Sequence, residues 1–585
     1  MDNKTMAGLL SETADLMEID GADGFRVRSY RRAAEAAEQT TVDLVEAASD
    51  AARLMEIDGI GKSMAAKLQA IVSTGALPQR DELLKKYGAG ILELLKLPGM
   101  GPKTVALLWD AAKIGSVNQL AEAIEAGRLK GLPRMGEKQI EKLRKGIEDY
   151  RRSVGRFRID AAEEEAERIA AYLLKFKGID KVTPAGSLRR GRETVGDLDL
   201  LATGPACAPE KTGPAVEYVA AYPGIHDIIA KGENKVSFHD AQGLQVDVRL
   251  LPSASYGAAL QYFTGSKGHN VVLRQRALKM GYTLNEWALA RLDDESQVAA
   301  ATEEEIYAAL KMDWMPPEMR ENLGEIDAAA EHKLPRVVSL GDIRGDVHMH
   351  TTASDGRNSI GEMAEAAVEC GYQYIAITDH SKFIGITNGM DAKRALEQIK
   401  EVRKADRAMN ESGKGRIRIF TGIEVDILND GKLALDDEVL AQMDVVIASV
   451  HSRFEQSREE MTERVMRAIE NPNVRILGHP TGRLLLRREP FALDMVAVLK
   501  RAAELGVAME HNADPARLDL SDRDLRLAKE LGCKIVMSSD SHDSANLGKM
   551  GFGARQLRRA WLTPEDVLNT RDAKGFLAGL RPRPE

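Results

Sequence analysis

The spacing of hydrophobic and polar residues divides the chain into three parts. In residues 1–155 apolar residues recur at every third or fourth position, with Gly and Pro between segments, which predicts an almost entirely helical part. In residues 156–325 short β-branched runs mix with helical patterns, which predicts an α+β fold. There we expect strands at Lys181–Thr183, Leu198–Thr203 and Leu244–Leu250, and helices at Ala161–Phe176 and Asn270–Met280.

The last part, residues 342–585, alternates regularly between strand-like and helical segments. Helical patterns such as Ile360–Cys370 and Leu493–Leu505 fill the gaps between seven apolar runs. This alternation predicts a closed (β/α) barrel close to the eightfold type, in which all strands end at one face. The predicted strands are Asp346–His350, Tyr374–Thr378, Ile417–Glu424, Val445–Val450, Val474–Leu477, Val507–Glu510 and Lys534–Ser538.

The composition excludes several classes of protein. The 585 residues are 44% hydrophobic and 29% charged, which is typical of a folded globular protein with several domains. Only 3 Cys are present, too few for a disulfide framework, so a reducing compartment is expected. No apolar run approaches the roughly 18 residues of a membrane span, and the N-terminus lacks the pattern of a secretion signal. We therefore expect a cytoplasmic protein.

The formal net charge of −9 is unevenly distributed. Residues 1–158 contain 25 basic and 23 acidic side chains, a net charge of +2, so the rest of the chain has a net charge of −11. DNA is bound through a local basic face, so the total charge does not exclude it. The excess of acidic residues in the later parts provides candidate metal ligands.

The helical part contains a repeated glycine turn. Ile57–Ser63 is echoed by Leu97–Thr104 and, without its first glycine, by Leu132–Lys138. A Gly-x-Gly turn between two helices exposes backbone N–H groups to which a phosphate can come close, which predicts contacts with a DNA backbone. A tight helix–helix turn with no ligand is the alternative, and we favour it for the third copy. The candidate DNA contacts are Gly59, Gly61, Lys62, Gly99, Gly101 and Lys103.

The middle part contains three candidate metal ligands. Asp197 and Asp199 are two residues apart on a predicted strand, so both side chains project from the same face. Adjacent carboxylates repel each other unless a cation lies between them, and oxygen ligands favour Mg²⁺. Asp247, in a second strand, adds a third carboxylate and predicts a two-metal phosphoryl-transfer site. Gly186, Ser187 and Arg190 would bind a polyphosphate. A surface strand with no ligand is the alternative.

These motifs resemble the X family of DNA polymerases, typified by DNA polymerase beta. The pattern runs from Gly186 to Asp199, and Tyr262-Phe263-Thr264-Gly265-Ser266, Asn270 and Arg274 narrow the resemblance to polymerases. It implies a nucleotidyltransferase palm and a helical thumb or fingers region of about residues 252–325. By the same resemblance, the nucleotide-binding residues are Gly186, Ser187, Arg190, Gly196, Arg249, Tyr262, Phe263, Gly265 and Asn270, and Arg274 contacts the template strand.

The N-terminal helices resemble the small lyase-type domain of that family. Phe25–Ala34, which includes Tyr30, is similar to the segment that grips a 5′-phosphate. Lys67 lies at the position of the Schiff-base lysine, whereas Ser63 replaces a second lysine of the beta type. The lower positive charge near Lys67 should leave its amine less nucleophilic. A solvated helix lysine is the alternative interpretation.

Histidine and acidic side chains gather at the ends of the predicted barrel strands. In a (β/α) barrel these ends meet at one face, so nine ligands should converge. Such a set suits two or three ions of Zn²⁺, Mn²⁺ or Fe²⁺ with bridging carboxylates, and it performs hydrolytic phosphoester chemistry. For any single histidine, a core position is the alternative. The nine residues are His348, His350, Asp355, His380, Glu424, His451, His479, Asp540 and His542, with Glu510 and His511 as candidate outer neighbours.

This region resembles the polymerase and histidinol phosphatase (PHP) domain, which implies a distorted (β/α)7 barrel. We expect a gap-filling DNA repair polymerase that binds gapped or primed DNA, dNTPs and Mg²⁺. The barrel should contain a 3′→5′ exonuclease that depends on Mn²⁺ or Zn²⁺. We expect the protein to be a monomer. A small-molecule phosphatase such as histidinol phosphatase, or an inactive DNA-binding scaffold, are the alternatives. The expected segments are residues 1–80 and 81–155 (helix-hairpin-helix), 156–251 (palm), 252–326 (thumb), 327–341 (linker) and 342–585 (PHP).

Overall fold

The computed structural model describes residues 3–40, 42, 44–57, 59–97, 99–129, 132–133, 135–153, 155–382, 387–411 and 417–582. Asp58, Pro98 and Arg134 of the three glycine turns lie outside these ranges. The chain forms two compact units, Met1–Val154 and Gly155–Glu585, and each is described here by itself. No helix of the described ranges combines the length and the hydropathy needed to cross a membrane.

The first unit is all-helical, as predicted. One apolar cluster extends through it, from Leu10 and Leu68 to Leu108 and Leu143, so both predicted helix-hairpin-helix regions share a single core. Arg80 also binds Glu12, with 2.7 Å between Nε and Oε2. In the described residues the helices are α1 (Asn3–Ile19), α2 (Gly24–Gln39), α3 (Leu44–Ala47), α4 (Ala51–Met55), α5 (Lys62–Thr74), α6 (Pro78–Tyr87), α7 (Gly90–Leu94), α8 (Pro102–Ala112), α9 (Val117–Glu125) and α10 (Glu137–Ser153).

The palm is built on a five-stranded sheet in the order β2-β4-β7-β6-β5. Strands β4 and β7 are parallel to each other, and the other pairs are antiparallel. The sequence does not predict the hairpin β5–β6, because charged residues interrupt its apolar pattern. The elements are β1 (Phe157–Arg158), α11 (Ile159–Leu173), β2 (Lys181–Pro184), α12 (Gly186–Arg189), β3 (Thr194–Val195), β4 (Asp197–Thr203), α13 (Thr212–Ala220), β5 (Ile225–Lys231), β6 (Lys235–Asp240) and β7 (Gln245–Leu251).

The thumb is not wholly helical, which corrects the prediction for residues 252–325. An antiparallel sheet of three strands lies between its helices. Each strand has only three residues, too few for a period-two pattern to appear in the sequence. The last helix also enters the expected linker. The elements are α14 (Tyr256–Thr264), α15 (Lys267–Lys279), β8 (Tyr282–Leu284), β9 (Leu289–Arg291), β10 (Gln297–Ala299), α16 (Glu303–Ala309) and α17 (Glu325–Ala330).

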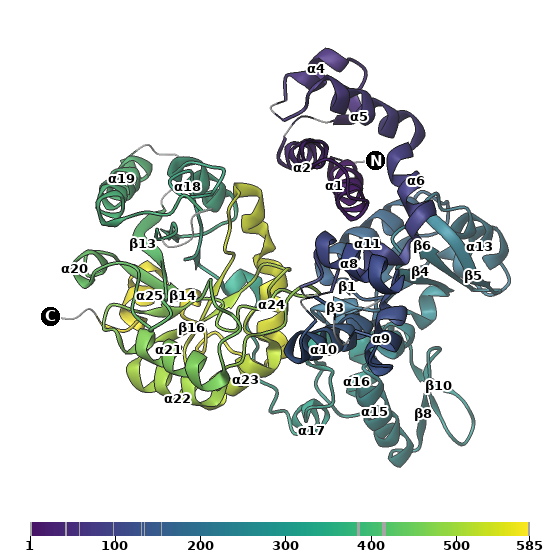
Figure 1. Ribbon diagram of the computed structural model, residues 1–585. Helices are drawn as coiled ribbons and strands as arrows, with labels where there is room; N and C mark the ends of the chain where they lie inside the picture. The colour runs from purple at the N-terminus through teal and green to yellow at the C-terminus, as the bar shows by residue number, and fades with distance from the viewer. Residues whose placement is uncertain are drawn as a thin grey trace. The chain divides into compact units, whose positions relative to one another are not determined.

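The PHP region forms the predicted seven-stranded parallel barrel, with its strands in chain order. Figure 1 shows its strands β13, β14 and β16, with helices such as α21 and α22 packed around them. A bridge between Met349 and Ser541 brings the first strand's continuation beside the last and nearly closes the sheet. The strands are β11 (Gly345–Asp346), β12 (Tyr374–Ile377), β13 (Arg418–Asp426), β14 (Val445–Ser449), β15 (Ile476–Leu477), β16 (Ala508–Asn512) and β17 (Ile535–Ser538). The helices are α18 (Ile360–Glu369), α19 (Ala392–Glu411), α20 (Asp437–Leu440), α21 (Arg458–Glu470), α22 (Met495–Leu505), α23 (Asp522–Glu530), α24 (Met550–Arg559) and α25 (Ala573–Gly579).

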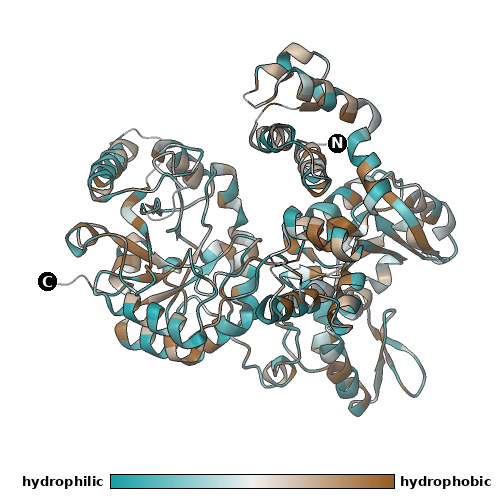
Figure 2. Ribbon diagram, viewed as in Figure 1, coloured by the Kyte–Doolittle hydropathy of each residue, from teal (hydrophilic) through white to brown (hydrophobic). Residues whose placement is uncertain are grey.

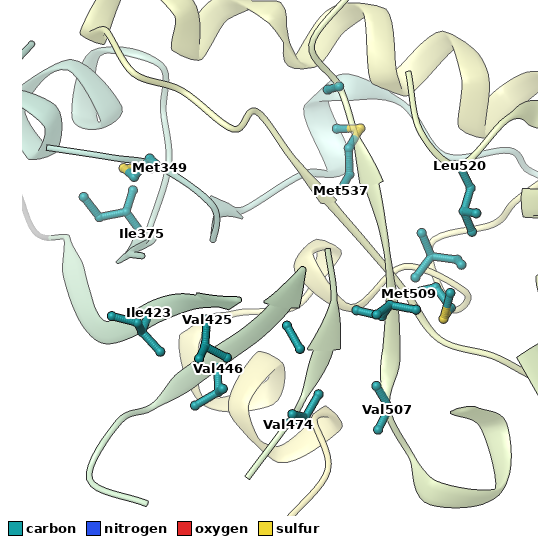
Figure 3. Packing of buried hydrophobic residues seen from close by; sticks show 14 of the residues in the cluster. Met349, Ile375, Ile423, Val425, Val446, Val474, Val507, Met509, Leu520 and Met537 are labelled. Carbon is teal, nitrogen blue, oxygen red and sulfur yellow. The ribbon is translucent and has the colours of Figure 1, made fainter. Parts of the chain in front are cut away.

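Two barrel strands differ from the prediction. The first strand ends at Asp346, and His348 and His350 follow it in irregular extended chain. Strand β13 continues past Glu424 to Asp426, so Glu424 does not close the strand as expected. Apolar side chains such as Val425, Val446 and Met509 fill the core beside the strands (Figure 3). Figure 2 shows that the surrounding helices carry hydrophobic and hydrophilic residues together, as expected for helices with one buried face.

Candidate active sites

The three predicted palm carboxylates lie on two adjacent strands. Asp199 of β4 and Asp247 of β7 are direct Cα partners, and Asp197 lies two residues earlier on β4. A Cβ atom at Gly186 would approach Asp199 Oδ2 to 2.5 Å, and this glycine has a left-handed φ of +57°. Only glycine therefore fits where the loop passes the aspartates.

The electrostatics of this trio favour a bound cation. Burial raises the pKa of Asp199 to about 6, and the neighbouring charges of Asp197 and Asp247 add to the effect. Asp247 Oδ1 and Ser187 Oγ are buried and make no hydrogen bond within the described residues. Unsatisfied buried oxygens and mutually repelling carboxylates are the groups that a divalent cation and a phosphate would satisfy.

Lys235, which the sequence does not identify as a site residue, forms an ion pair with Asp247. Lys235 Nζ lies 2.7 Å from Asp247 Oδ2, while Arg249 Nη2 lies 3.6 Å from the same atom. Burial raises the pKa of Asp247, but the hydrogen bonds from Lys235 and Ser237 lower it by more. The net shift of the pKa is therefore downward. Lys235 lies on β6, beside β7, and only the strand register identifies this contact.

The predicted nucleotide residues surround the start of the thumb. Arg190 Nη1 donates to the carbonyl of Thr264, and the Arg249 guanidinium lies 4.2 Å from the centre of the Phe263 ring. The Asn270 amide donates to the carbonyl of Tyr262 at 2.7 Å.

Three further predicted residues flank this group. Gly265 has a φ of +68° and lies beside Arg190 Nη1. Gly196 immediately precedes β4, and Arg274 is exposed on α15, one helical turn after Asn270. The structure thus brings Arg190, Gly265 and Asn270 to one end of the palm.

The first two of the three glycine turns have the geometry of a phosphate-binding turn. Gly59 and Gly99 have φ values of +94° and +77°, and Gly61 and Gly101 are the N-cap residues of α5 and α8. Their amides therefore stand at helix N-termini, where anions are favoured. Lys62 and Lys103 lie in the first turn of these helices, and each turn borders a cavity, of about 1100 Å³ and 460 Å³ respectively.

Lys67 lines the larger cavity together with Tyr30. Its Nζ lies 2.9 Å from Ser63 Oγ and 5.5 Å from the centre of the Tyr30 ring. Partial burial and the nearby charge of Arg26 lower the pKa of Lys67 below its ordinary value. The sequence predicts a less nucleophilic amine from Ser63 alone, because the effect of Arg26 depends on the fold.

Glu424 lies at the centre of the histidine cluster in the barrel. Its Oε2 lies 2.8 Å from His380 Nδ1 and 3.4 Å from His348 Nε2. Its Oε1 lies 2.9 Å from His479 Nε2 and 3.2 Å from His451 Nε2. His350 Nε2 also lies 3.7 Å from Oε2. One carboxylate therefore faces five imidazoles, three at Oε2 and two at Oε1, as expected of a carboxylate shared between metal ions.

The other predicted ligands extend this cluster. Asp540 Oδ1 lies 3.1 Å from His350 Nε2. Asp355 lies 3.5 Å from His542 Nε2 and 3.6 Å from His380 Nε2. All nine predicted ligands thus converge, from separate barrel segments, on one site.

The donor set fits more than one metal ion. Three groups have ligand atoms within 4.8 Å of one another, and these groups share members. Within the described chain, buried atoms of the cluster such as His348 Nε2, His350 Nδ1 and Glu424 Oε2 make no hydrogen bond. Although burial lowers it, the carboxylates of Glu424 and Asp426 raise the pKa of His451 to about 9. The three groups are His350, Asp355, His380 and His542; His348, His350 and Glu424; and His380, Glu424 and His451.

Buried carboxylates behind the ligands fix the imidazole rings. Glu510 Oε1 lies 2.6 Å from His348 Nδ1, and Asp426 Oδ1 lies 2.9 Å from His451 Nδ1. The sequence does not identify Asp426 as a member of the site, because this residue lies two positions past the predicted end of its strand at Glu424. His511 projects elsewhere, since its Nδ1 bonds to the carbonyl of Leu520 at 2.9 Å.

Two ligands have unusual backbone conformations. His479 has a φ of +23° and Asp540 a φ of +53°, values that residues with side chains rarely adopt. The surrounding hydrogen bonds hold this strain, as the His479 amide donates to Glu510 and the Asn512 amide side chain donates to Asp540 Oδ2 at 2.9 Å. Arg517 Nε lies 3.4 Å from the same oxygen and places a cation beside the cluster.

Carboxylates on two inner strands of the sheet, with the segment that carries Gly186, Ser187 and Arg190, define a metal-dependent nucleotidyltransferase. The barrel cluster defines a metal-dependent phosphoesterase. The chain matches four family models: Helix-hairpin-helix domain (residues 1–77), SAM-like Helix-hairpin-helix tandem (91–149), DNA polymerase beta thumb (259–321) and PHP domain (346–512). It is 37% identical to the DNA polymerase/3′-5′ exonuclease PolX of Bacillus subtilis (strain 168), over 99% of this chain and 100% of that protein. The chain belongs to this PolX family, the family X DNA polymerases with a C-terminal PHP domain, and it is an enzyme of the DNA polymerase/3′-5′ exonuclease type.

Other similarities are partial. A probable phosphatase of Thermoanaerobacter sp. (strain X514) is 31% identical over 38% of this chain and 89% of its own length. A crystal structure of Leishmania infantum polymerase beta in a ternary P/T complex covers 40% of this chain and 98% of that chain, with 23% identity and a TM-score of 0.27.

Proposed function

We propose that this polymerase fills short gaps in DNA during repair and that the barrel removes nucleotides from the 3′ end of the same strand. The observation that carries the proposal is that one chain contains two separate and complete sets of ligands. Asp197, Asp199 and Asp247 meet on the palm sheet, and the nine barrel ligands gather around Glu424.

In the palm, Asp197 and Asp199 would hold Mg²⁺, with Asp247 as a further ligand. Asp247 Oδ1, which makes no hydrogen bond in the described part of the chain, is the atom that accepts the proton of the primer hydroxyl. Ser187 and Arg190 bind the triphosphate, and Arg249 orients the aspartates from its position 3.6 Å from Asp247.

In the barrel, Glu424 and the surrounding histidines and aspartates would hold two or three ions of Mn²⁺ or Zn²⁺. When bound, divalent cations in both sites neutralise phosphate charge and lower the pKa of a coordinated hydroxyl or water. Glu510 and Asp426 keep the His348 and His451 rings in position through the contacts at their Nδ1 atoms. Arg517 adds positive charge beside Asp540 for the phosphate of a DNA strand.

The helical unit would hold the DNA by its backbone. The amides at Gly61 and Gly101 and the side chains of Lys62 and Lys103 bind phosphates on either side of a gap. Tyr30 contacts a 5′-phosphate in the larger cavity, beside Lys67. We propose that the enzyme works as a monomer, which light scattering on the purified protein would test.

A small-molecule phosphatase is the second candidate, because the Thermoanaerobacter phosphatase aligns with the barrel. That similarity covers 38% of this chain, so the candidate leaves the palm and the helical unit without a role. Release of phosphate from histidinol phosphate at a rate above that of DNA cleavage would favour it.

The deciding experiment is an assay on a gapped duplex with and without dNTPs, in Mg²⁺ and in Mn²⁺. We expect extension with dNTPs and 3′→5′ shortening without them. Asp247→Ala should abolish extension and leave shortening, whereas His348→Ala should do the reverse. Loss of both activities in either variant would contradict two independent sites. The same variants on an abasic-site duplex and on blocked 3′ ends show whether the barrel also nicks and trims DNA.

A further inference from the structure

The palm loop that follows the nucleotide-binding segment is bonded to the PHP barrel. This loop, Arg190–Glu193, lies between α12 and the short strand β3, which immediately precedes the strand that carries Asp197 and Asp199. Gln556 Nε2 of α24 donates to the carbonyl of Gly191 at 2.7 Å. Gly191 has a φ of +65°, and a Cβ there would lie 2.9 Å from Arg555 Cβ, so the loop and the helix are in close contact.

Arg559, the last residue of α24, reaches the nucleotide-binding segment itself. Its side chain is 3% exposed, and Nη1 donates both to the main-chain carbonyl of Arg190 at 2.8 Å and to Glu321 Oε1 at 2.9 Å. On its other side, Arg559 pairs with Asp522 at 2.7 Å. The guanidinium is thus fixed within the barrel and extends to the palm and to the thumb.

Glu321 joins the two arginines. Its Oε1 accepts from Arg190 Nε at 3.0 Å and from Arg559 Nη1 at 2.9 Å. Arg190 Nη1 is also bound, to the carbonyl of Thr264, so its bonds use Nε and Nη1. In the part of the chain that the structure describes, Nη2 has no partner, so its donors remain for a phosphate oxygen. The two guanidinium groups share the Glu321 carboxylate, so its negative charge does not fully neutralise either arginine.

We propose that Arg559 is a positioning residue for the polymerase reaction, by which the PHP barrel holds the Arg190 guanidinium ready for the triphosphate of the incoming nucleotide. The proposal rests on the proposed role of Arg190 in binding the triphosphate. It gives the barrel a second task, which does not involve its metal ligands.

The effect of removing Arg559 follows from these contacts. The Arg190 carbonyl loses a charged donor, and Glu321 loses one of its two cations. Glu321 is then free to bind the Arg190 fork with both oxygens, which draws the guanidinium away from the nucleotide. Binding of the nucleotide weakens, while the aspartates that carry the reaction stay in place.

The test is steady-state gap filling by the full-length protein. Arg559→Gln should raise the KM for dNTP about tenfold, equivalent to about 1.4 kcal/mol, with kcat within about twofold of wild type. Arg559→Lys keeps the charge without the fork and should give a smaller increase. Adding Glu321→Gln to Arg559→Gln should recover part of the affinity, because it removes the competing carboxylate. The exonuclease rate should not change.

Arg555→Gln is the matched control. Arg555 lies on the same helix and forms two bonds of 2.6 Å with Glu163 of the palm, but it touches neither Arg190 nor Glu321. If docking of the barrel alone were responsible, Arg555→Gln would raise KM as much as Arg559→Gln, and the proposal would be wrong. An unchanged KM in both Arg559 variants would also overturn it, provided that Arg190→Ala raises KM. If Arg190→Ala leaves KM unchanged, the triphosphate role of Arg190 is wrong, and this inference fails with it.

Discussion

Asp199 and Asp247 lie directly opposite each other on two parallel strands of the palm. Their carboxylates, with that of Asp197, accumulate negative charge in a largely buried place, and the pKa of Asp199 rises to about 6. A protein with such a group is less stable in the absence of cations, and it becomes more stable when the group is neutralised.

Asp199→Asn should therefore stabilise the metal-free protein. Ionised Asp199 destabilises the fold above pH about 6, by up to about 3 kcal/mol, and this penalty disappears as the pH falls towards the unfolded value. We expect the variant to melt at a higher temperature than wild type in chelator at neutral pH, and at a similar temperature at pH 4. A lower melting temperature at neutral pH would show that Asp199 is not strained by its neighbours. The same variant should not extend a primer.

Glu424→Gln should lower the metal content of the barrel. Glu424 faces five histidines and belongs to two of the three ligand groups, so the neutral amide removes the anionic ligand that these two groups share. Elemental analysis of the purified variant should find less bound metal, and exonuclease activity should be lost while extension continues. Glu510→Gln is the matched control, since it lies behind His348 and should weaken metal binding only about 10–100-fold. Retention of full metal content in Glu424→Gln would contradict the bridging role.

Glu303→Gln should destabilise the thumb. Glu303 is 4% exposed and pairs with Arg189 at 2.8 Å and with Arg320 at 2.6 Å. Burial alone would raise the pKa of Glu303, but the two arginines outweigh it and hold the pKa well below its ordinary value. Breaking such a buried pair costs about 3–5 kcal/mol. Urea unfolding followed by tryptophan fluorescence measures the loss, because Trp314 Nε1 donates to Glu303 at 3.2 Å.

Glu304→Gln serves as the comparison for this change. Glu304 is the next residue on α16 and is exposed. Its substitution should shift the unfolding midpoint very little. Equal shifts in the two variants would mean that the charge pairs of Glu303 contribute nothing measurable.

Lys67 should form a covalent adduct with an abasic-site DNA. Its lowered pKa, caused by partial burial and by Arg26, increases the fraction of neutral amine at neutral pH. Borohydride should trap a protein–DNA complex with wild type, and Lys67→Ala should reduce trapping at least about tenfold. Lys85→Ala, an exposed lysine on α6, should leave it unchanged. Equal trapping by Lys67→Ala would assign the chemistry to another amine.

The sequence predicts the regular features of this protein well. The seven barrel strands repeat an apolar run followed by an amphipathic helix, and a parallel sheet must bring their ends together, so the convergence of His348, Glu424 and Asp540 could be expected. Asp197 and Asp199 share a face because strand geometry requires it. In both cases local periodicity and one rule of topology are sufficient.

What the sequence could not predict depends on contacts between distant segments. Lys235 contacts Asp247 only because β6 pairs with β7 in one particular register. Arg559 reaches Arg190 across 369 residues of sequence. The thumb sheet has strands too short to carry a pattern. Asp426 and Arg517 look like ordinary surface charges until the fold places them beside the ligands.

The conformations of His479 and Asp540 have a consequence for how the barrel takes up its ions. Both residues are held by main-chain geometry and by contacts within the protein: the His479 backbone amide donates to Glu510, and Asp540 Oδ2 accepts from the Asn512 side chain and lies 3.4 Å from Arg517 Nε. The ligand site of the barrel is therefore shaped during folding, and an arriving ion meets ligands that are already in place. Which metal the nuclease uses is then decided by the supply of metals around the protein, since a rigid site of mixed nitrogen and oxygen donors accepts several of them.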